Sequence, residues 1–169
     1  MKYFFCCFAG LLIMFSVLVK AEAISFTIIA QTGDTIGGKT LTSFHSDPSL
    51  NDNGEVAFTG AFSGGSGIFT QNSLIAASGD SIGGKTLDSL SGAFLNSNGD
   101  IAFRSTFSGG SGIFTQNSLI AASGDSIGGK TLDSLSGAFL NSNGDIAFRS
   151  TFSGGSGIFT QNSLIAASG

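Results

Sequence analysis

The sequence has few charges, one proline, no tryptophan and a single tyrosine. Charged residues make up 11% of the chain, and the formal net charge is −4. Binding nucleic acid through its phosphates needs clustered Lys and Arg, so this charge balance argues against a nucleic-acid partner. Sugar-binding sites usually present Trp or Tyr faces. The only tyrosine, Tyr3, lies at the extreme N-terminus. The composition therefore favours neither nucleic-acid nor carbohydrate binding.

Cysteine is nearly absent as well. The only two cysteines, Cys6 and Cys7, lie in an apolar N-terminal stretch, and Phe5 stands where a lipoprotein signal would need a small residue. A chain without this stretch has no thiol, which excludes a disulfide, a thiolate metal site and a cysteine nucleophile. Packing alone must then stabilise the fold.

The same stretch is organised like a secretory signal peptide. Lys2 supplies the positive charge, residues 4–19 form an uncharged run of 16 residues, and residues 21–23 read Ala-Glu-Ala, a small-x-small cleavage pattern. We therefore expect cleavage near Ala23 and a secreted, periplasmic or cell-surface mature chain that contacts the membrane only through its signal segment. An uncleaved anchor is the alternative, although the run is shorter than the ~20 residues of a membrane-spanning helix.

An internal repeat organises the rest of the chain. Residues 80–124 and 125–169 are identical at every position, with 45 residues each. Residues 34–79 are a diverged first copy that is one residue longer, and its last part matches the later copies. Residues 24–33 resemble the end of a preceding unit, so we expect them to form a leading strand of the array. Repeats of this length indicate a solenoid, a propeller or a similar array.

Each unit carries signals for short strands and tight turns. In the second copy, Asn98-Gly99 predicts a two-residue type I′ hairpin turn. Residues 101–107 alternate with a period of two and predict a strand with one largely apolar face. The glycine-rich residues 108–111 should break this strand. Residues 113–115 and 118–122 are then expected as the third and fourth strands.

Four short antiparallel strands per ~45 residues match the blade of a β-propeller. The chain contains 17 Phe residues. We expect these Phe-rich faces to cover one another between neighbouring units, because a single sheet cannot bury both of its faces. The predicted fold is therefore all-β, with three stacked blades in an open array; a β-solenoid is the alternative. Open sheet edges invite pairing, so we also expect self-association, for example two chains closing a six-bladed ring.

One eight-residue motif recurs in register. Residues 51–58, 96–103 and 141–148 all read N-x-x-G-x-x-A-F. The chain thus resembles the bacterial family of exported tandem NxxGxxAF-repeat proteins. This resemblance covers the chain from about Phe26 to Gly169. It implies a propeller-like ectodomain of uncharacterised role, and it supplies no catalytic residues.

A second motif matches the phosphate-binding P-loop. Residues 79–86 satisfy G-x-x-x-x-G-K-[ST], and so do residues 33–40 and 124–131. A nucleotide site needs this loop between a strand and a helix of a parallel α/β sheet. A loop that recurs every ~45 residues leaves no room for such a fold. We therefore interpret it as a turn between blades, whose glycines supply positive φ.

Calcium binding and catalysis are the remaining chemical candidates. Asn96, Asn98 and Asp100 alternate across a turn, but one carboxylate per turn is too few for a hard cation, so we expect these side chains to bond their own turn. His45 is the only histidine, beside Asp47-Pro48, and we interpret it as a surface loop residue. The turn pattern of Asn96, Asn98 and Asp100 recurs in the other two repeats as Asn51, Asn53, Glu55, Asn141, Asn143 and Asp145.

The acidic residues are repeated rather than unique. Asp80, Asp88 and Asp100 recur one unit later as Asp125, Asp133 and Asp145. A carboxylate pair could in principle hydrolyse glycosidic bonds. Duplicated acids, however, are more typical of turns than of a single active site. Arg104 and Arg149 are expected to be solvated charges opposite the apolar face.

These patterns assign no catalytic, cofactor-binding or metal-ligating residue. We therefore predict a non-catalytic secreted or cell-surface module that is structural or binds an unknown extracellular partner. Identical units would present the same loops several times, which favours multivalent binding. The alternatives are a secreted carboxylate-dependent hydrolase and a truncated, non-functional fragment.

Overall fold

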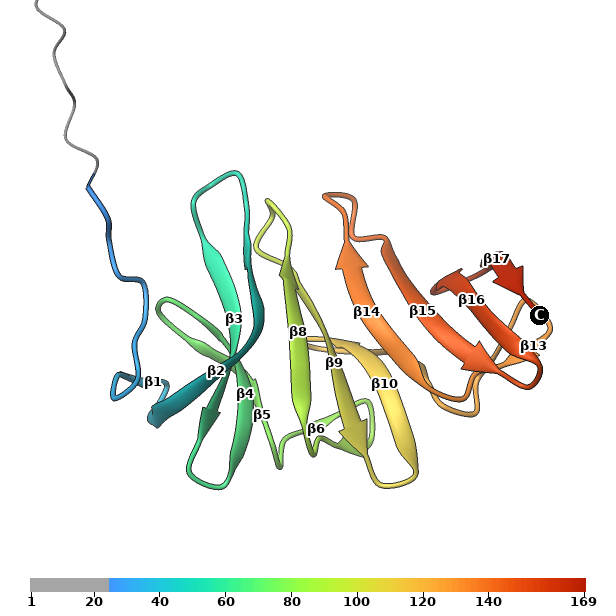
Figure 1. Ribbon diagram of the computed structural model, residues 1–169, viewed down its shortest axis with the longest axis horizontal. Helices are drawn as coiled ribbons and strands as arrows, with labels where there is room; N and C mark the ends of the chain where they lie inside the picture. Colours follow the sequence, from blue (N-terminus) through green and yellow to red (C-terminus); the bar gives the residue numbers. More distant parts are fainter. Residues whose placement is uncertain (1–24) are drawn as a thin grey trace, which may run out of the picture.

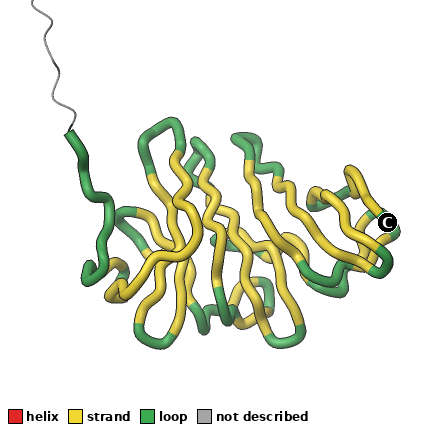
Figure 2. Tube along the Cα trace, in the orientation of Figure 1, coloured by secondary structure: helices red, strands yellow, loops and turns green. Residues whose placement is uncertain are grey.

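The computed structural model describes residues 25–169, and this part of the chain contains 17 strands and no helix (Figure 2). All five sheets pair their strands in antiparallel fashion. The predicted all-β fold is therefore confirmed. The predicted signal peptide, residues 1–23, lies outside the described residues. Within them, no helix is long and apolar enough to cross a membrane.

The first repeat forms a five-stranded sheet whose strands are neighbours in chain order. The strands are β1 (Thr35–Ile36), β2 (Lys39–Leu50), β3 (Val56–Phe62), β4 (Gly65–Thr70) and β5 (Leu74–Ala77).

The second and third repeats each form a four-stranded sheet of the same topology. The second sheet comprises β8 (Leu90–Leu95), β9 (Ile101–Phe107), β10 (Gly110–Thr115) and β11 (Leu119–Ala122). The third comprises β14 (Leu135–Leu140), β15 (Ile146–Phe152), β16 (Gly155–Thr160) and β17 (Leu164–Ser168). Short hairpins precede them: β6 (Ser81–Ile82) with β7 (Lys85–Thr86), and β12 (Ser126–Ile127) with β13 (Lys130–Thr131).

The three large sheets follow one another along the long axis of the molecule (Figure 1). The first strand of each later sheet lies against the preceding sheet, since β8 contacts β2 and β3, and β14 contacts β8 and β9. This face-to-face stacking of antiparallel four-stranded units is the blade arrangement that the repeat predicted. The parallel coils of a β-solenoid do not occur in residues 25–169.

Each sheet has two different faces. The aromatic face points towards the N-terminal neighbour and carries Phe103, Phe107 and Phe114 in the second repeat, with Phe148, Phe152 and Phe159 as their counterparts in the third. The alanine face points towards the C-terminal neighbour. It comprises Ala57, Ile68 and Ala76 in the first repeat, Ala102, Ile113 and Ala121 in the second, and Ala147, Ile158 and Ala166 in the third.

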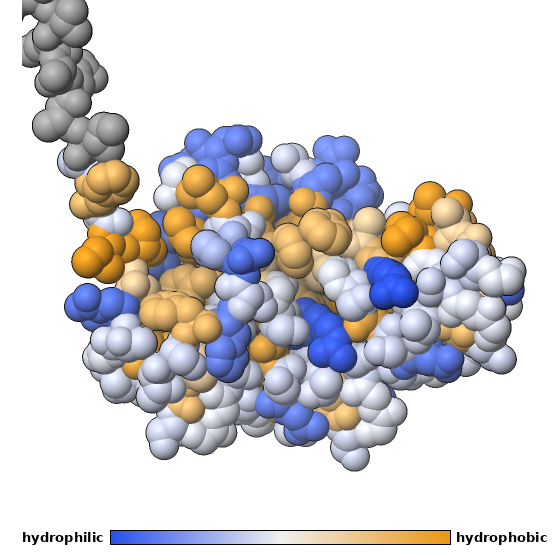
Figure 3. Space-filling view, in the orientation of Figure 1, coloured by the Kyte–Doolittle hydropathy of each residue, from blue (hydrophilic) through white to orange (hydrophobic). Residues whose placement is uncertain are grey.

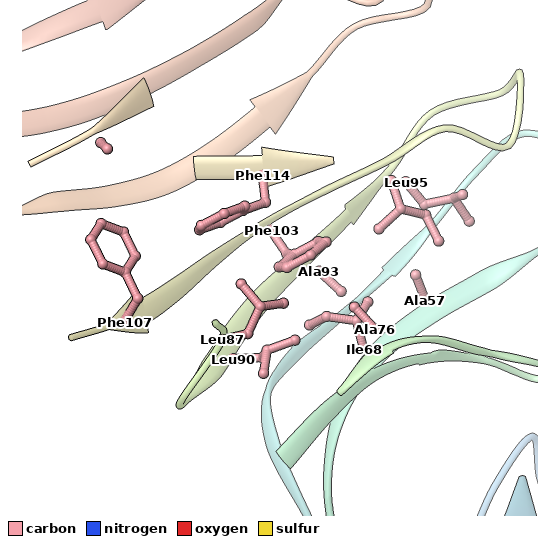
Figure 4. Close-up of a cluster of buried hydrophobic side chains, with 12 residues drawn as sticks. Ala57, Ile68, Ala76, Leu87, Leu90, Ala93, Leu95, Phe103, Phe107 and Phe114 are labelled. Carbon is pink, nitrogen blue, oxygen red and sulfur yellow. The ribbon is translucent and has the colours of Figure 1, made fainter. Parts of the chain in front are cut away.

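The apolar cores join neighbouring repeats (Figure 4). The first strand of one sheet lies against the alanine face of the preceding sheet, and its leucine and alanine side chains share a cluster with the Phe rings of their own sheet. The expectation that Phe-rich faces cover each other is therefore wrong. The buried rings of one sheet pack among themselves, with the Phe103 and Phe114 centroids 5.9 Å apart. One ring pair meets across repeats, Phe94 and Phe139, and Phe139 is exposed. Small side chains opposite large ones let the sheets interdigitate at the density of a protein interior.

The predicted leading strand, residues 24–33, is not formed: residues 25–33 contain no strand, and the first one is β1. The later segments that it resembles are β5 and β11, and each of these pairs with β4 or β10 of its own repeat. Residues 25–33 have no such partner strand in the described part of the chain, so their backbone forms no β-sheet hydrogen bonds.

Two turn predictions also need correction. The turn at residues 96–100 is not type I′, because only Gly99 has positive φ (85°) there, and its N–H bonds the Asn96 carbonyl at 3.1 Å. This pattern is that of a type I turn followed by a left-handed glycine. The predicted break at residues 108–111 is shorter than expected, since β10 already begins at Gly110.

Thr59 carries the only buried side-chain oxygen without a hydrogen-bond partner in residues 25–169. It lies on β3 between Ala57 and Ala61 and is 0% exposed. We expect Thr59→Val to raise the free energy of unfolding by about 1–2 kcal/mol, because it removes the unpaired hydroxyl at nearly constant volume. Urea denaturation measures this change. Thr59→Ser keeps the hydroxyl and should destabilise; equal stabilities of the two variants would contradict the explanation.

Candidate functional site

The N-x-x-G motifs form the turn between the first two long strands of each repeat. In the second repeat, Asn96 Oδ1 accepts the N–H groups of Asn98 at 3.0 Å and Asp100 at 2.9 Å. Its Nδ2 donates to the Asp100 carboxylate at 3.0 Å. Asn51 and Asn141 make the same bonds in the other two turns. The expected bonding of each turn by its own side chains is therefore confirmed.

The same asparagines also join the repeats. Asn51 Nδ2 donates to the Asn96 carbonyl at 2.9 Å, and Asn96 Nδ2 donates to the Asn141 carbonyl at 3.0 Å. Asn53 and Asn98 do likewise, donating to the backbone carbonyls of Ser97 and Ser142. The motif thus builds a directional amide ladder along one edge of the array, always from one repeat to the next.

We expect Asn96→Ala to lower the free energy of unfolding by about 2–3 kcal/mol, because it leaves two turn N–H groups without partners and removes the bond to the Asn141 carbonyl. Asn141→Ala is the matched control. It removes the same bonds within the turn but no bond to a following repeat. Its cost should be smaller by about 1–2 kcal/mol. Equal costs in chemical denaturation would show that the ladder bond contributes nothing.

Because of these hydrogen bonds, few side-chain oxygens of the turns remain to bind a cation. Asn96 directs both side-chain atoms at protein groups, and the carboxylates of Asp100 and Asp145 accept asparagine amides. Within residues 25–169, no three His, Cys, Asp or Glu side chains are grouped so as to hold a metal ion. The turns act as structural connectors in this geometry.

The P-loop-like segment forms a two-residue hairpin between repeats. Ser81 pairs with Thr86 and Ile82 with Lys85, so Gly83 and Gly84 form the turn, with φ of 58° and 75°. Positive φ at both turn positions is the type I′ geometry. The expected turn between blades is therefore confirmed, and no helix follows it, as a phosphate cradle would require.

The lysine of this segment points at an aromatic ring. Lys85 Nζ lies 4.8 Å from the centroid of the Phe107 ring, and Lys39 and Lys130 lie 4.7 Å above Phe62 and Phe152. A cation above a ring face is attracted by the ring's quadrupole, which is worth ~0.5–1 kcal/mol at an exposed site. The three lysines therefore attach the hairpins to the sheets.

The remaining candidate residues do not converge on one site. His45 is exposed, as expected, but it lies within strand β2 rather than in a loop, with Nε2 3.2 Å from Ser43 Oγ. The Asp80 and Asp125 carboxylates accept the N–H groups of Ala77 and Ala122 in their own turns. These contacts fit the turn chemistry that the duplication suggested.

Arg104 is not a solvated charge. It is half-buried on the alanine face of the second sheet, and its Nε donates to the Leu135 carbonyl of the third repeat at 2.5 Å. Arg149 has the same position in the third repeat and is exposed. Guanidinium groups can bond a carbonyl while their stems cover apolar surface, which suits the rim of a stacked interface.

The rings of Phe58, Phe62 and Phe69 in the first repeat are buried, but the outer side of β2 is open. Phe44 and Leu50 are exposed there, whereas their β8 counterparts are buried against the preceding sheet. A groove of about 470 Å³ lies there, with exposed Phe44 and Leu50 on one side and Ile28 and Ile29 on the other. Apolar side chains gather over this N-terminal end of the molecule (Figure 3). Ala30 packs on the same face, where Ala76 and Ala121 pack on the following sheets. The groove is thus an uncompleted repeat–repeat interface.

Sequence reasoning missed the ladder, the role of Arg104 and this groove. The sequence holds a signal for the ladder, since both asparagines of each N-x-N turn recur at ~45-residue spacing. Turn propensity by itself predicts only the bonds within each turn. The groove depends on which residues of one face meet which of the next, and that follows from stacking geometry.

Described by its geometry, the molecule is an all-β tandem-repeat protein of stacked antiparallel sheets with complementary faces. Residues 13–132 match a family of unknown function, DUF7453, and this match spans more than half of the chain. The chain therefore belongs to the DUF7453 family. No curated protein and no solved structure matches it.

Proposed function

We propose that the protein is a non-catalytic, exported repeat module that acts at or beyond the cell surface as a structural or binding element. The observation that carries this proposal is the use of its recurrent polar residues. The asparagine, aspartate, lysine and arginine side chains of the motifs bond turns, neighbouring repeats or aromatic rings. Their chemistry is thus directed at assembling the array.

The export part of the proposal rests on the N-terminal sequence, with Lys2, the uncharged residues 4–19 and the Ala-Glu-Ala pattern. The resemblance to bacterial exported NxxGxxAF-repeat proteins supports the same location. The ladder gives that motif a physical role, because its asparagine joins one repeat to the next.

Fractionation of the producing cells tests the location. We expect the protein in the medium or the cell envelope, with a new N-terminus at Ile24 by mass spectrometry. An intact N-terminus on a cytoplasmic protein would contradict the proposal.

Deleting residues 80–124 separates a binding module from an enzyme. Residues 80–124 and 125–169 are identical, so the deletion joins the first repeat to the same sequence as before. A multivalent module should fold and bind its target surface with graded weakening. A second experiment tests for an enzyme by replacing single aspartates with asparagine. Loss of all turnover in one Asp→Asn variant would overturn the non-catalytic assignment.

A further inference from the structure

The alanine face of the third repeat lies open in residues 25–169, although its counterparts are buried. Ile68 and Ile113 are 0% exposed beneath the next repeat, whereas Ile158 is 43% exposed. Ala166 is exposed, and its counterpart Ala121 is 1% exposed. Because the second and third repeats have identical sequences, this end presents the same side chains that elsewhere form a tight interface.

The first repeat presents the complementary surface on β2, where Phe44 is 42% and Leu50 is 69% exposed. Their counterparts Leu90 and Leu95 on β8 are buried against the preceding sheet. Phe58, Phe62 and Phe69 form the cluster that corresponds to Phe103, Phe107 and Phe114, and the groove of about 470 Å³ opens beside Phe44. In the internal interfaces, the equivalent position receives Ala57 and Ile68, or Ala102 and Ile113, of the preceding sheet. This groove therefore fits Ala147 and Ile158.

The two ends also carry matching hydrogen-bonding groups. The Asn141 side chain bonds only within its own turn, while the Asn51 and Asn96 side chains also reach a following repeat. Arg149 is exposed, while its counterpart Arg104 donates to the Leu135 carbonyl. By alignment of the repeats, the acceptors for Asn141 and Arg149 on a following unit would be the carbonyls of Asn51 and Phe44.

We propose that the third repeat of one chain stacks on the first repeat of a second copy, continuing the internal repeat–repeat interface head to tail. Such an interface joins unlike patches and so extends into rows or closes into rings. The faces carry this association, in contrast to the pairing of sheet edges expected from the sequence. It names the partner of the proposed binding module and rests on that function.

One segment competes with the second copy. Ala30 occupies the place on the first aromatic face that Ala166 of the second copy would take, as judged from Ala76 and Ala121. Stacking therefore displaces residues 25–30 from the groove. We expect the association between chains to be reversible and weaker than the internal interfaces, which have no such competitor.

Disulfide trapping tests the orientation. Ser97 Oγ lies 2.9 Å from the Asp52 carboxylate across the first internal interface, and Ser142 is the counterpart of Ser97 at the far end. One chain carries Asp52→Cys and the other Ser142→Cys, both in the full chain with Cys6 and Cys7 replaced by serine. We expect a disulfide-linked dimer, seen on a non-reducing gel, in the mixture of the two chains but in neither sample alone.

Charge substitutions identify the face. Ile158→Glu should abolish the cross-link and shift analytical ultracentrifugation to the monomer, while Ser153→Glu, an equal charge on the exposed β15–β16 turn, should leave both unchanged. Three results would overturn the proposal: a monomer at all concentrations, equal cross-linking of Ser142→Cys alone, or no effect of Ile158→Glu. The exposed faces would then be covered by residues 1–24 or by an unlike partner. Export of a monomeric chain would leave the proposed function standing.

Discussion

Phe114→Ala is expected to lower the free energy of unfolding by about 3–5 kcal/mol, the range for removing a fully buried ring. Phe114 is 0% exposed in the core between the first and second repeats. Its ring stacks on Phe103 at 5.9 Å and meets Phe107 edge-on at 6.3 Å. Loss of the ring opens a cavity that the small side chains of the facing sheet cannot fill.

Phe139→Ala is the matched control for this change. Phe139 is 61% exposed, although its ring centroid lies 4.5 Å from that of Phe94. Truncating it should cost about 1 kcal/mol or less, the scale of one aromatic pair. Urea denaturation followed by circular dichroism compares the two variants. Similar costs would mean that the core between repeats does not hold the array together.

The sequence predicted the elements of this fold well because the signals are local. Period-two alternation over residues 101–107 identifies a strand wherever it occurs, and the observed strand has those bounds. Repeat boundaries followed directly from identity between residues 80–124 and 125–169. Such information needs no knowledge of how one sheet meets the next.

The errors came from properties that depend on neighbours. Asn98 favours positive φ by propensity, but its N–H bonds Asn96 Oδ1 and only Gly99 takes the left-handed conformation. The sequence alone predicts a solvated Arg104, because charged side chains usually lie in solvent, yet the third repeat supplies a carbonyl for it. Residues 25–33 have strand-like sequence without a strand to pair with.

The candidate site was even less predictable. Whether an asparagine bonds its own turn or the next repeat depends on a distance between residues 45 positions apart. The open groove requires knowing that the first strand of one sheet meets the alanine face of the preceding sheet. Both facts depend on how one sheet is aligned on the next, and the sequence of a single repeat does not specify that alignment.

Gly83→Ala is expected to destabilise the fold by about 2–5 kcal/mol, from two effects that add. Left-handed φ costs a non-glycine residue ~1–2 kcal/mol, and overpacking costs a further ~1–3 kcal/mol. Gly83 has φ of 58°, and a Cβ built on it would lie 2.4 Å from Leu119 Cβ. The hairpin of β6 and β7 therefore packs closely against β11 at Gly83, where only a residue without a Cβ fits.

Gly84→Ala separates the two effects. Gly84 also has positive φ (75°), but a Cβ there would meet nothing within 4 Å. Gly84→Ala should thus cost only the backbone strain, and the difference between the variants measures the contact with Leu119. Equal costs in thermal or urea denaturation would refute close packing of this turn.

Replacing Lys85 distinguishes a phosphate-binding loop from a structural hairpin in the G-x-x-x-x-G-K-[ST] segment. In a phosphate loop, Lys85 would bind a phosphate, so Lys85→Ala would abolish nucleotide binding. In the hairpin described here, Lys85 lies over the Phe107 ring, and its removal should cost about 0.5–1 kcal/mol of stability. Calorimetry with ATP and Mg²⁺ should show no binding to the unmodified chain, because backbone N–H groups at Ile82 and Lys85 pair across the hairpin. Binding that depends on Lys85 would instead establish a nucleotide site on a β-hairpin.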